Sequence, residues 1–231
     1  MKIFQYDSKF NQVLMTGADL IIMNFLYILC CLPIFTIGAA QAGLFTGIRV
    51  LLDKEDDSSC AKAFFRGFAN GFKTITIVHC IFYVLIALLV LLLLNILVWH
   101  YAGLGAPVWM VIVALAFAIT LHTMMAPFHA TFGCTVMQLL RNVFIVTLAH
   151  PLQSLLFTAL LYLPVAVLLY RLDWFMGASI LLLAIYYSVV YLIGFTLMKK
   201  PYQKLKDNFL NAQKEAQAIE TEAAPVAAEE E

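Results

Sequence analysis

The feature that most constrains this chain is a long stretch without charge, since no Asp, Glu, Lys or Arg occurs between Lys73 and Arg141. A soluble domain of this size would need charged side chains to cover its surface. The whole 231-residue chain is 63% hydrophobic and only 12% charged, whereas about a quarter of the residues in soluble domains are charged. Its mean hydropathy is +0.91. The sequence therefore predicts an integral membrane protein whose solvent is the lipid bilayer.

Six apolar segments are candidate membrane spans, because a helix needs about 20 apolar residues to cross the hydrocarbon core. Four of them are long and unambiguous, and two shorter ones form the opening stretch. In chain order, the predicted spans are 15–32, 36–52, 75–99, 107–132, 152–170 and 174–198. We expect an all-α, polytopic transmembrane helix bundle in residues 1–206.

Pro33 determines how the opening stretch is interpreted. Proline lacks a backbone N–H and disfavours helix in the residue before it, so a continuous helix is not expected to pass through the sequence LPIFTIG. The favoured interpretation is a hairpin of two short crossings with Pro33 in its turn, which gives six spans. The alternative is five spans, with residues 36–52 not fully crossing the membrane.

The distribution of Lys and Arg indicates the orientation of the spans. With six crossings and a cytoplasmic N-terminus, thirteen of the 14 basic residues lie inside and only Arg171 lies outside. A single opening crossing would move Lys2 and Lys9 outside and leave eleven inside. The tryptophans agree, because Trp collects at membrane interfaces and all three fall at the predicted outer face. These outer-interface residues are Trp99, Trp109 and Trp174. We predict that both termini are cytoplasmic.

Residues 59–73 predict a cytoplasmic amphipathic helix. At 100° per residue, four phenylalanines share one side of this helix and the basic residues occupy the other. The phenylalanines are Phe64, Phe65, Phe68 and Phe72, and the basic residues are Lys62, Arg66 and Lys73. Two interpretations remain open. The helix anchors at the lipid interface, or it docks on a partner protein.

Small residues recur every four positions in the second predicted span. One row is formed by Gly38, Ala42 and Thr46, and a second by Ala39, Gly43 and Gly47. Such small-xxx-small patterns let the backbones of membrane helices approach closely. We therefore expect a packed inner helix. Its Gln41 and Arg49 should face other protein or the cytoplasmic interface, because facing lipid is costly.

Polar residues inside the predicted spans are the candidate site residues. They are Asn24, Gln41, His122 and His129. His122 and His129 are separated by about 10.5 Å along one helix axis, which is too far for both to bind one zinc ion at about 2.1 Å each. Hydrogen bonding inside the protein is the first interpretation of these residues, and a functional role is the second.

Motifs that carry chemistry are absent from the sequence. It contains no H-E-x-x-H, no G-x-S-x-G, no P-loop and no paired acids within the spans. We therefore predict no catalytic residues, no metal, no cofactor and no enzymatic activity, and we expect no nucleic-acid partner. A less favoured alternative is an enzyme acting on a lipid substrate with His129, His150 and Arg141 near the cytoplasmic face.

The C-terminal residues 207–231 differ in composition from the rest of the chain. Six glutamates follow Leu210, and large apolar side chains are few. A segment of this kind cannot bury enough apolar surface to fold by itself. We expect an acidic, disordered cytoplasmic tail.

The sequence LIIMNFLYILCCLPIFTIGAAQAGLF, residues 20–45, resembles the N-terminal signature of the YesL-like bacterial membrane proteins. The matching positions are Asn24, Leu32, Pro33, Ile34, Thr36, Ile37, Gly38 and Ala39. A weaker match is AFFRGFANGFK, which resembles the family's aromatic segment with Gly71 inserted. The resemblance covers residues 1–202. It implies a protein of the bacterial cytoplasmic (inner) membrane, encoded near carbohydrate ABC importers and without an established activity or site.

The favoured functional hypothesis is a non-enzymatic accessory component of carbohydrate uptake. Its candidate partners are the permease subunits of a carbohydrate ABC importer, and it depends on the resemblance and on the amphipathic segment. The alternative is a channel or facilitator that passes a small solute through its own helix bundle. Scattered Asn, Gln, Thr and His residues in otherwise apolar spans suggest this alternative.

Overall fold

The computed structural model describes residues 9–53, 59–99, 105–170 and 185–227, which are helical apart from short turns. The elements are α1 (Lys9–Cys30), the 3-10 helix η1 (Ile34–Thr36), α2 (Ile37–Asp53), α3 (Cys60–Trp99), α4 (Ala106–Phe132), α5 (Val136–Ala149), α6 (Pro151–Tyr170) and α8 (Tyr187–Ala227). No strand occurs in these residues, so the prediction of an all-α protein is confirmed. The chain divides into two compact units, Met1–Phe195 and Thr196–Glu231, and α8 contributes to both.

Five helices in the described part of the chain are long and apolar enough to cross a membrane. Their apolar segments are Val13–Cys30, Ile34–Leu52, Cys60–Val98, Ala106–Phe132 and Pro151–Leu168. They support the prediction of a multi-pass membrane protein. The sixth predicted span, 174–198, begins outside the described residues, and Trp174 also lies outside them. This crossing and the place of Trp174 at the outer interface therefore stay predictions.

The turn between α1 and α2 is built around Pro33 and Thr36. The Thr36 hydroxyl lies 2.5 Å from the carbonyl oxygen of Cys30 and 2.6 Å from that of Pro33. The last carbonyl groups of a helix lack partners within the helix. Thr36 therefore offers a donor to the end of α1 at the point where Pro33 prevents the helix from continuing. The opening stretch forms two helices joined by a short turn.

α2 is the most buried helix of the first unit. All its residues from 38 to 48 are buried, and α3 packs along it. A methyl group placed on Gly43 would lie 2.8 Å from the carbonyl oxygen of Phe64, and one on Gly47 would lie 3.2 Å from that of Cys60. The two backbones approach this closely because the glycines carry no side chain. The small-residue rows thus lie in the buried part of α2, where the sequence predicts a packed inner helix.

The predicted amphipathic helix at 59–73 is not a separate element. It forms the first turns of α3, which continues unbroken for 40 residues to Trp99. At 1.5 Å per residue, α3 is about 60 Å long, whereas the hydrocarbon core is about 30 Å thick. The first turns, in which Lys62, Arg66 and Lys73 are exposed, therefore extend beyond what one crossing requires. They continue the axis of the spanning helix and do not form a second helix along the surface.

The phenylalanines of this segment divide between two environments. Phe64 is fully buried and Phe68 is half-buried, and both approach Gly43 of α2. Phe65 and Phe72 are exposed on the outside of the unit. This arrangement differs from the single lipid-facing side expected from the sequence. Phe64 and Phe68 pack where α2 has Gly43, whereas Gly67 of α3 packs against Ala42 and Thr46.

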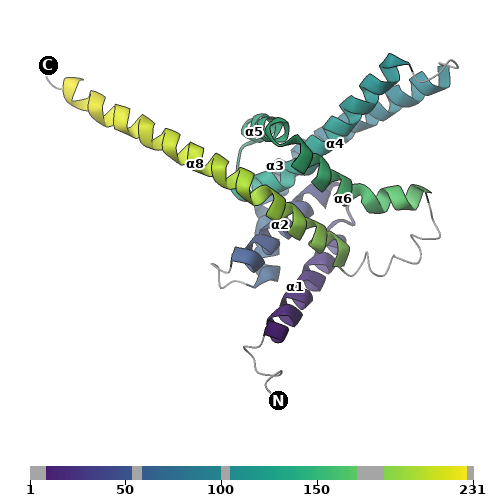
Figure 1. Ribbon diagram of the computed structural model, residues 1–231, viewed down its shortest axis with the longest axis horizontal. Coiled ribbons are helices and arrows are strands. Elements are labelled where there is room, and N and C mark those ends of the chain that lie inside the picture. Colours follow the sequence, from purple (N-terminus) through teal and green to yellow (C-terminus); the bar gives the residue numbers. More distant parts are fainter. Residues whose placement is uncertain (1–8, 54–58, 100–104, 171–184, 228–231) are drawn as a thin grey trace. The chain divides into compact units, whose positions relative to one another are not determined.

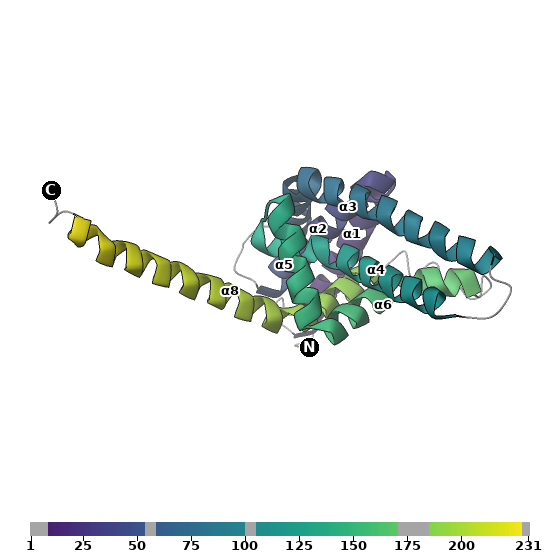
Figure 2. The ribbon, with the colours of Figure 1, turned by 90° about the horizontal axis from the view of Figure 1, so that it is seen from above.

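α3 and α4 lie side by side (Figures 1 and 2). α3 ends at Trp99 and α4 begins at Ala106, so Trp99 and the exposed Trp109 share one end of this pair. At the other end, α4 stops at Gly133, whose φ of 60° is left-handed and favours glycine. The Gly133 N–H donates to the carbonyl oxygen of His129 at 2.8 Å.

α5 is a helix that the sequence analysis did not predict. Its 14 residues lie between the predicted spans 107–132 and 152–170 and are too few to cross a membrane. Its buried side chains are Leu139, Val143, Val146 and Thr147. This spacing is typical of an amphipathic helix, and it turns one face of α5 toward α4 and α6.

The second unit consists of the later part of α8. The helix continues to Ala227, through residues 207–227 for which the composition predicts disorder. Ala, Glu, Gln and Lys have high helix propensity, which accounts for helix in a segment that is poor in large apolar residues.

Candidate functional site

Four polar side chains from four helices meet in the interior of the first unit. Gln41 comes from α2, His79 from α3, His122 from α4 and Tyr162 from α6. We call these four residues the polar cluster. Gln41, His79 and His122 are only 3%, 0% and 2% exposed. Polar and ionisable groups buried inside membrane helices are costly and are functional-site candidates for that reason.

His79 is held by two neighbours. Its Nδ1 lies 3.1 Å from the carbonyl oxygen of Ile75, and its Nε2 lies 3.4 Å from Oε1 of the Gln41 side-chain amide. Because a carbonyl oxygen only accepts, Nδ1 carries a proton and donates to Ile75. In a neutral ring, Nε2 would accept from the Gln41 NH₂ group only after the amide turned over, because the structure places Oε1 beside Nε2. In a protonated ring, Nε2 donates to the Gln41 oxygen. Rotation of one amide therefore lets Gln41 pair with either state of His79.

His122 lies directly beside His79. The two ring centroids are 4.2 Å apart, and the rings are inclined by 55°. The Tyr162 hydroxyl lies 3.4 Å from Nδ1 of His122. Nε2 of His122 is buried and has no hydrogen-bond partner among the described residues. An unpaired buried polar atom costs about 1–3 kcal/mol, so Nε2 marks a position where a hydroxyl group or a water molecule would be stabilised.

The pair of imidazoles limits the charge that the polar cluster can hold. Two positive charges about 4 Å apart repel by roughly 4 kcal/mol even at an effective dielectric constant of 20. The pair therefore holds at most one proton beyond its neutral state. In the part of the chain that the structure describes, no group of three or more His, Cys, Asp and Glu side chains could hold a metal ion. The arrangement is suited to hydrogen bonding with a neutral polar molecule.

Gly38 makes the space that His79 occupies. A methyl group on Gly38 would lie 2.7 Å from Cγ and 2.8 Å from Cδ2 of the imidazole ring. Gly38 is two residues after Thr36, which closes the turn. The sequence LPIFTIG therefore determines both the break between α1 and α2 and the close approach of His79 to α2.

Two of the four candidate polar residues, Asn24 and His129, have their contacts outside the polar cluster. Asn24 is fully buried, and its side-chain oxygen accepts a hydrogen bond from the Ser188 N–H at 3.1 Å. Ser188 lies in the first turn of α8, where backbone N–H groups lack helical partners. Asn24 thus links α1 to α8. His129 is buried near the end of α4, where its carbonyl oxygen accepts from Gly133.

The two long polar side chains of α2 both face protein. Gln41 joins the polar cluster. Arg49 donates from Nη1 to the carbonyl oxygen of Ala130 at 3.1 Å, and Ala130 lies in the last turn of α4. A cation at a helix C-terminus is favourable, because the last carbonyl groups are unpaired and carry partial negative charge.

The sequence analysis did not include His79 or Tyr162 among the candidate residues. A weak signal for the histidine pair was nevertheless present in the spacing. His79 lies 20 residues before Trp99 (99 − 79), and His122 lies 16 residues after Ala106 (122 − 106). In two antiparallel neighbours, residues at similar distances from the connection face each other, and the difference of four is about one helical turn.

Residues 20–96 match a protein family described as Protein of unknown function, DUF624. The matched part, 77 of the 231 residues, runs from α1 into α3 and contains Pro33, Gly38, Gln41 and His79. His122 and Tyr162 lie outside it. No curated protein and no solved structure matches the chain.

Proposed function

We propose that this protein is a non-enzymatic facilitator that lets a small polar solute pass through its helix bundle. The polar cluster carries the proposal, because it collects hydrogen-bonding groups from four helices around a buried nitrogen without a partner. We further propose, from the distribution of basic residues and the YesL-like resemblance, that it is a multi-pass protein of the bacterial cytoplasmic membrane. Both termini are then cytoplasmic.

The chemistry of the polar cluster suits a neutral polyol. A hydroxyl group both donates and accepts hydrogen bonds. Nε2 of a neutral His122 accepts or donates according to which ring nitrogen carries the proton, and the Gln41 amide and the Tyr162 hydroxyl both donate and accept. An unpaired cation is a poor ligand, because none of the four residues is a carboxylate and a buried charge without a partner is costly.

Solute flux through reconstituted protein tests the proposal. Liposomes that contain the full chain are expected to swell several-fold faster in glycerol, erythritol or xylitol than protein-free liposomes, as followed by stopped-flow light scattering. His122→Phe keeps an aromatic ring but removes both nitrogens, and is expected to lower the rate to near the protein-free value.

A matched control is Asn95→Leu. Asn95 is an exposed polar residue in the apolar part of α3, on the same helix as His79 but outside the polar cluster, so its loss should leave the rate unchanged. Wild-type liposomes that swell no faster than protein-free ones with all three polyols would refute the proposal. Equal rates for the wild type and His122→Phe would show that the polar cluster plays no part.

The second candidate function is an accessory role in carbohydrate uptake. The observation that favours it is an exposed polar row along the first turns of α3, formed by Lys62, Arg66, Asn70 and Lys73. These residues extend beyond the apolar part of the helix, where a permease subunit of a carbohydrate ABC importer could contact them. The YesL-like resemblance adds the importer context.

Copurification from native bacterial membranes tests this second role. The tagged wild-type chain is expected to recover an importer permease subunit, and the charge reversal Lys62→Glu with Arg66→Glu to lose it. Lys206→Glu reverses an exposed charge in the second unit and should have no effect. Recovery of no importer subunit by the wild type, together with normal sugar uptake in a deletion strain, would exclude the role.

A further inference from the structure

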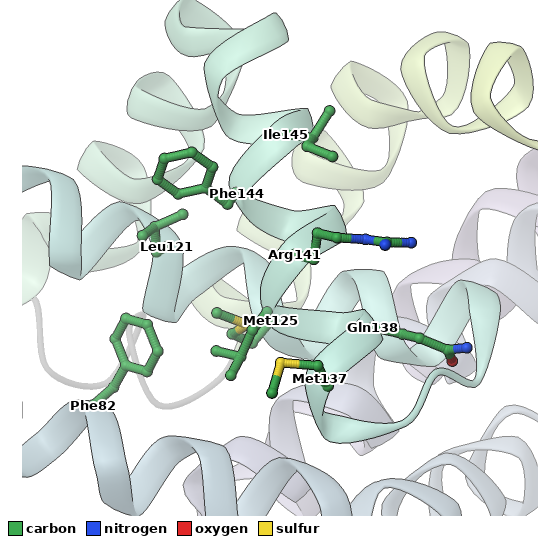
Figure 3. A pocket seen from close by; sticks show the side chains of 9 residues that line it. Phe82, Leu121, Met125, Met137, Gln138, Arg141, Phe144 and Ile145 are labelled. Atoms are coloured by element: carbon green, nitrogen blue, oxygen red, sulfur yellow. The ribbon is translucent and has the colours of Figure 1, made fainter.

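A concave site lies between α3, α4 and α5 in the first unit. Its volume is about 620 Å³, within the range of about 300–1,000 Å³ that is typical of pockets for small ligands. Apolar side chains form most of its wall, among them Phe82 of α3, Leu121 and Met125 of α4 and Phe144 of α5 (Figure 3). We call this site the α5 pocket.

The polar residues of the α5 pocket offer hydrogen-bond donors on one face of α5. Gln138 and Arg141 are three residues apart, so they share a side of the helix, and Figure 3 shows both extending to the same side, away from Phe82 and Phe144. The Gln138 oxygen already accepts from the Thr135 N–H at 3.3 Å, which leaves its NH₂ group as a donor. Arg141 is exposed, and no carboxylate among the described residues pairs with it.

The apolar lining residues of α4 and the polar lining residues of α5 lie at different distances from the end of α4. Leu121 and Met125 precede the last residue of α4, Phe132, by 11 and 7 residues, or about 16 and 10 Å along the helix axis. Gln138 and Arg141 follow the Gly133 turn. Arg141 is also the only charged residue between Lys73 and Arg171, and it lies beyond the end of α4, a helix long and apolar enough to cross a membrane. The α5 pocket is therefore apolar toward the membrane interior and cationic toward the interface.

We propose that the α5 pocket binds a phospholipid with an anionic headgroup. One acyl chain occupies the apolar wall between Phe82, Leu121, Met125 and Phe144. The phosphate accepts hydrogen bonds from the Arg141 guanidinium and the Gln138 amide. Arginine is well suited to this contact, because its planar donors match a phosphate group in a two-point interaction. The site borders the polar cluster, since the ring centroids of Phe82 and His122 are 6.3 Å apart. It uses different hydrogen-bonding residues, so the binding of lipid and the passage of solute can be tested independently.

Native mass spectrometry of the full chain tests this site. The protein is extracted from vesicles that contain equal amounts of phosphatidylglycerol and phosphatidylcholine. Both lipids carry a phosphate, but only phosphatidylcholine also carries a cation, which would lie near the Arg141 guanidinium and repel it. Phosphatidylglycerol is therefore expected to remain bound about tenfold more often than phosphatidylcholine, a difference of about 1.4 kcal/mol. Arg141→Gln should lower this ratio to about one, and Arg141→Lys, which keeps the charge but loses the planar donors, should retain part of it.

Two controls separate this site from general attraction of anionic lipid. Lys62→Gln removes an exposed cation from α3, outside the α5 pocket, and should leave the ratio unchanged. Soluble glycerol phosphate should not displace the lipid, because it lacks the acyl chain. A wild-type ratio near one, a ratio that Arg141→Gln leaves unchanged, or displacement by glycerol phosphate would each overturn the proposal. Because Arg141 is exposed, loss of folding is not expected in its variants.

Discussion

Replacement of Gly43 by alanine is expected to lower the free energy of unfolding by about 1–3 kcal/mol, the usual cost of overpacking a well-packed interior. The added methyl group would lie 2.8 Å from the carbonyl oxygen of Phe64 and 3.3 Å from both the Phe64 ring and Cβ of Phe68. A side chain can rotate away from such a contact, but a backbone carbonyl group in α3 moves only with its helix. α2 and α3 would have to separate along their contact. Thermal unfolding of the purified chain in detergent measures the effect as a fall in Tm.

Gly17→Ala is the matched control for this variant. Gly17 lies within α1, and no atom lies within 4 Å of a methyl group placed there. Alanine is a better helix former than glycine by about 1 kcal/mol, so the Tm should stay the same or rise. If Gly43→Ala unfolded at the wild-type temperature, the close approach of α2 and α3 would be wrong.

Replacement of Gly38 by alanine is expected to disturb both stability and the polar cluster. The methyl group would lie 2.7 Å from Cγ of His79 and 2.7 Å from Cγ2 of Ile75. The imidazole would then be pushed away from Gln41, with a cost again of about 1–3 kcal/mol. We expect a lower Tm and, if the proposed passage of solute is right, slower polyol flux.

A double-mutant cycle tests whether contact with His79 causes the loss of stability in Gly38→Ala. His79→Ala removes the ring that the new methyl group meets. The combined variant Gly38→Ala with His79→Ala should therefore lose less stability than the sum of the two single variants, by about 0.5–3 kcal/mol. Recovery should be partial, because the contact with Ile75 remains. Strictly additive losses would show that His79 does not lie against Gly38.

The local features of this fold could be predicted from the sequence because single residues determine them. Pro33 lacks a backbone N–H and disfavours helix in the residue before it, and a break is expected in the sequence LPIFTIG for that reason. Proline alone does not decide this, because Pro127 and Pro164 lie inside α4 and α6. The two rows of small residues, one with Gly38 and the other with Gly43 and Gly47, indicate a packed helix in the same direct way. The start of α5 was also encoded locally, since Thr135 and Gln138 have the spacing of a capping box. That signal was missed because the segment was interpreted only as a connection between two spans.

The polar cluster could not be predicted in this way, because it depends on contacts between distant parts of the chain. His79 and His122 are unremarkable within their own helices, and only the packing of α3 on α4 brings their rings together. Gln41 shows the same dependence. The sequence restricts it to protein or interface, but not to a particular partner. The environment of Phe64 likewise depends on Gly43, which lies on another helix.

The unbroken length of α3 has a mechanical consequence. The helix contains no proline between Cys60 and Trp99, so it acts as a rigid rod with the exposed basic residues Lys62 and Arg66 at one end. His79 lies about 26 Å further along the same axis from Lys62. A force that tilts or rotates the exposed end therefore displaces His79 relative to His122 on the neighbouring helix. Movement of the first turns of α3, which extend beyond the length needed for one crossing, is thus transmitted along the helix to the buried imidazole pair.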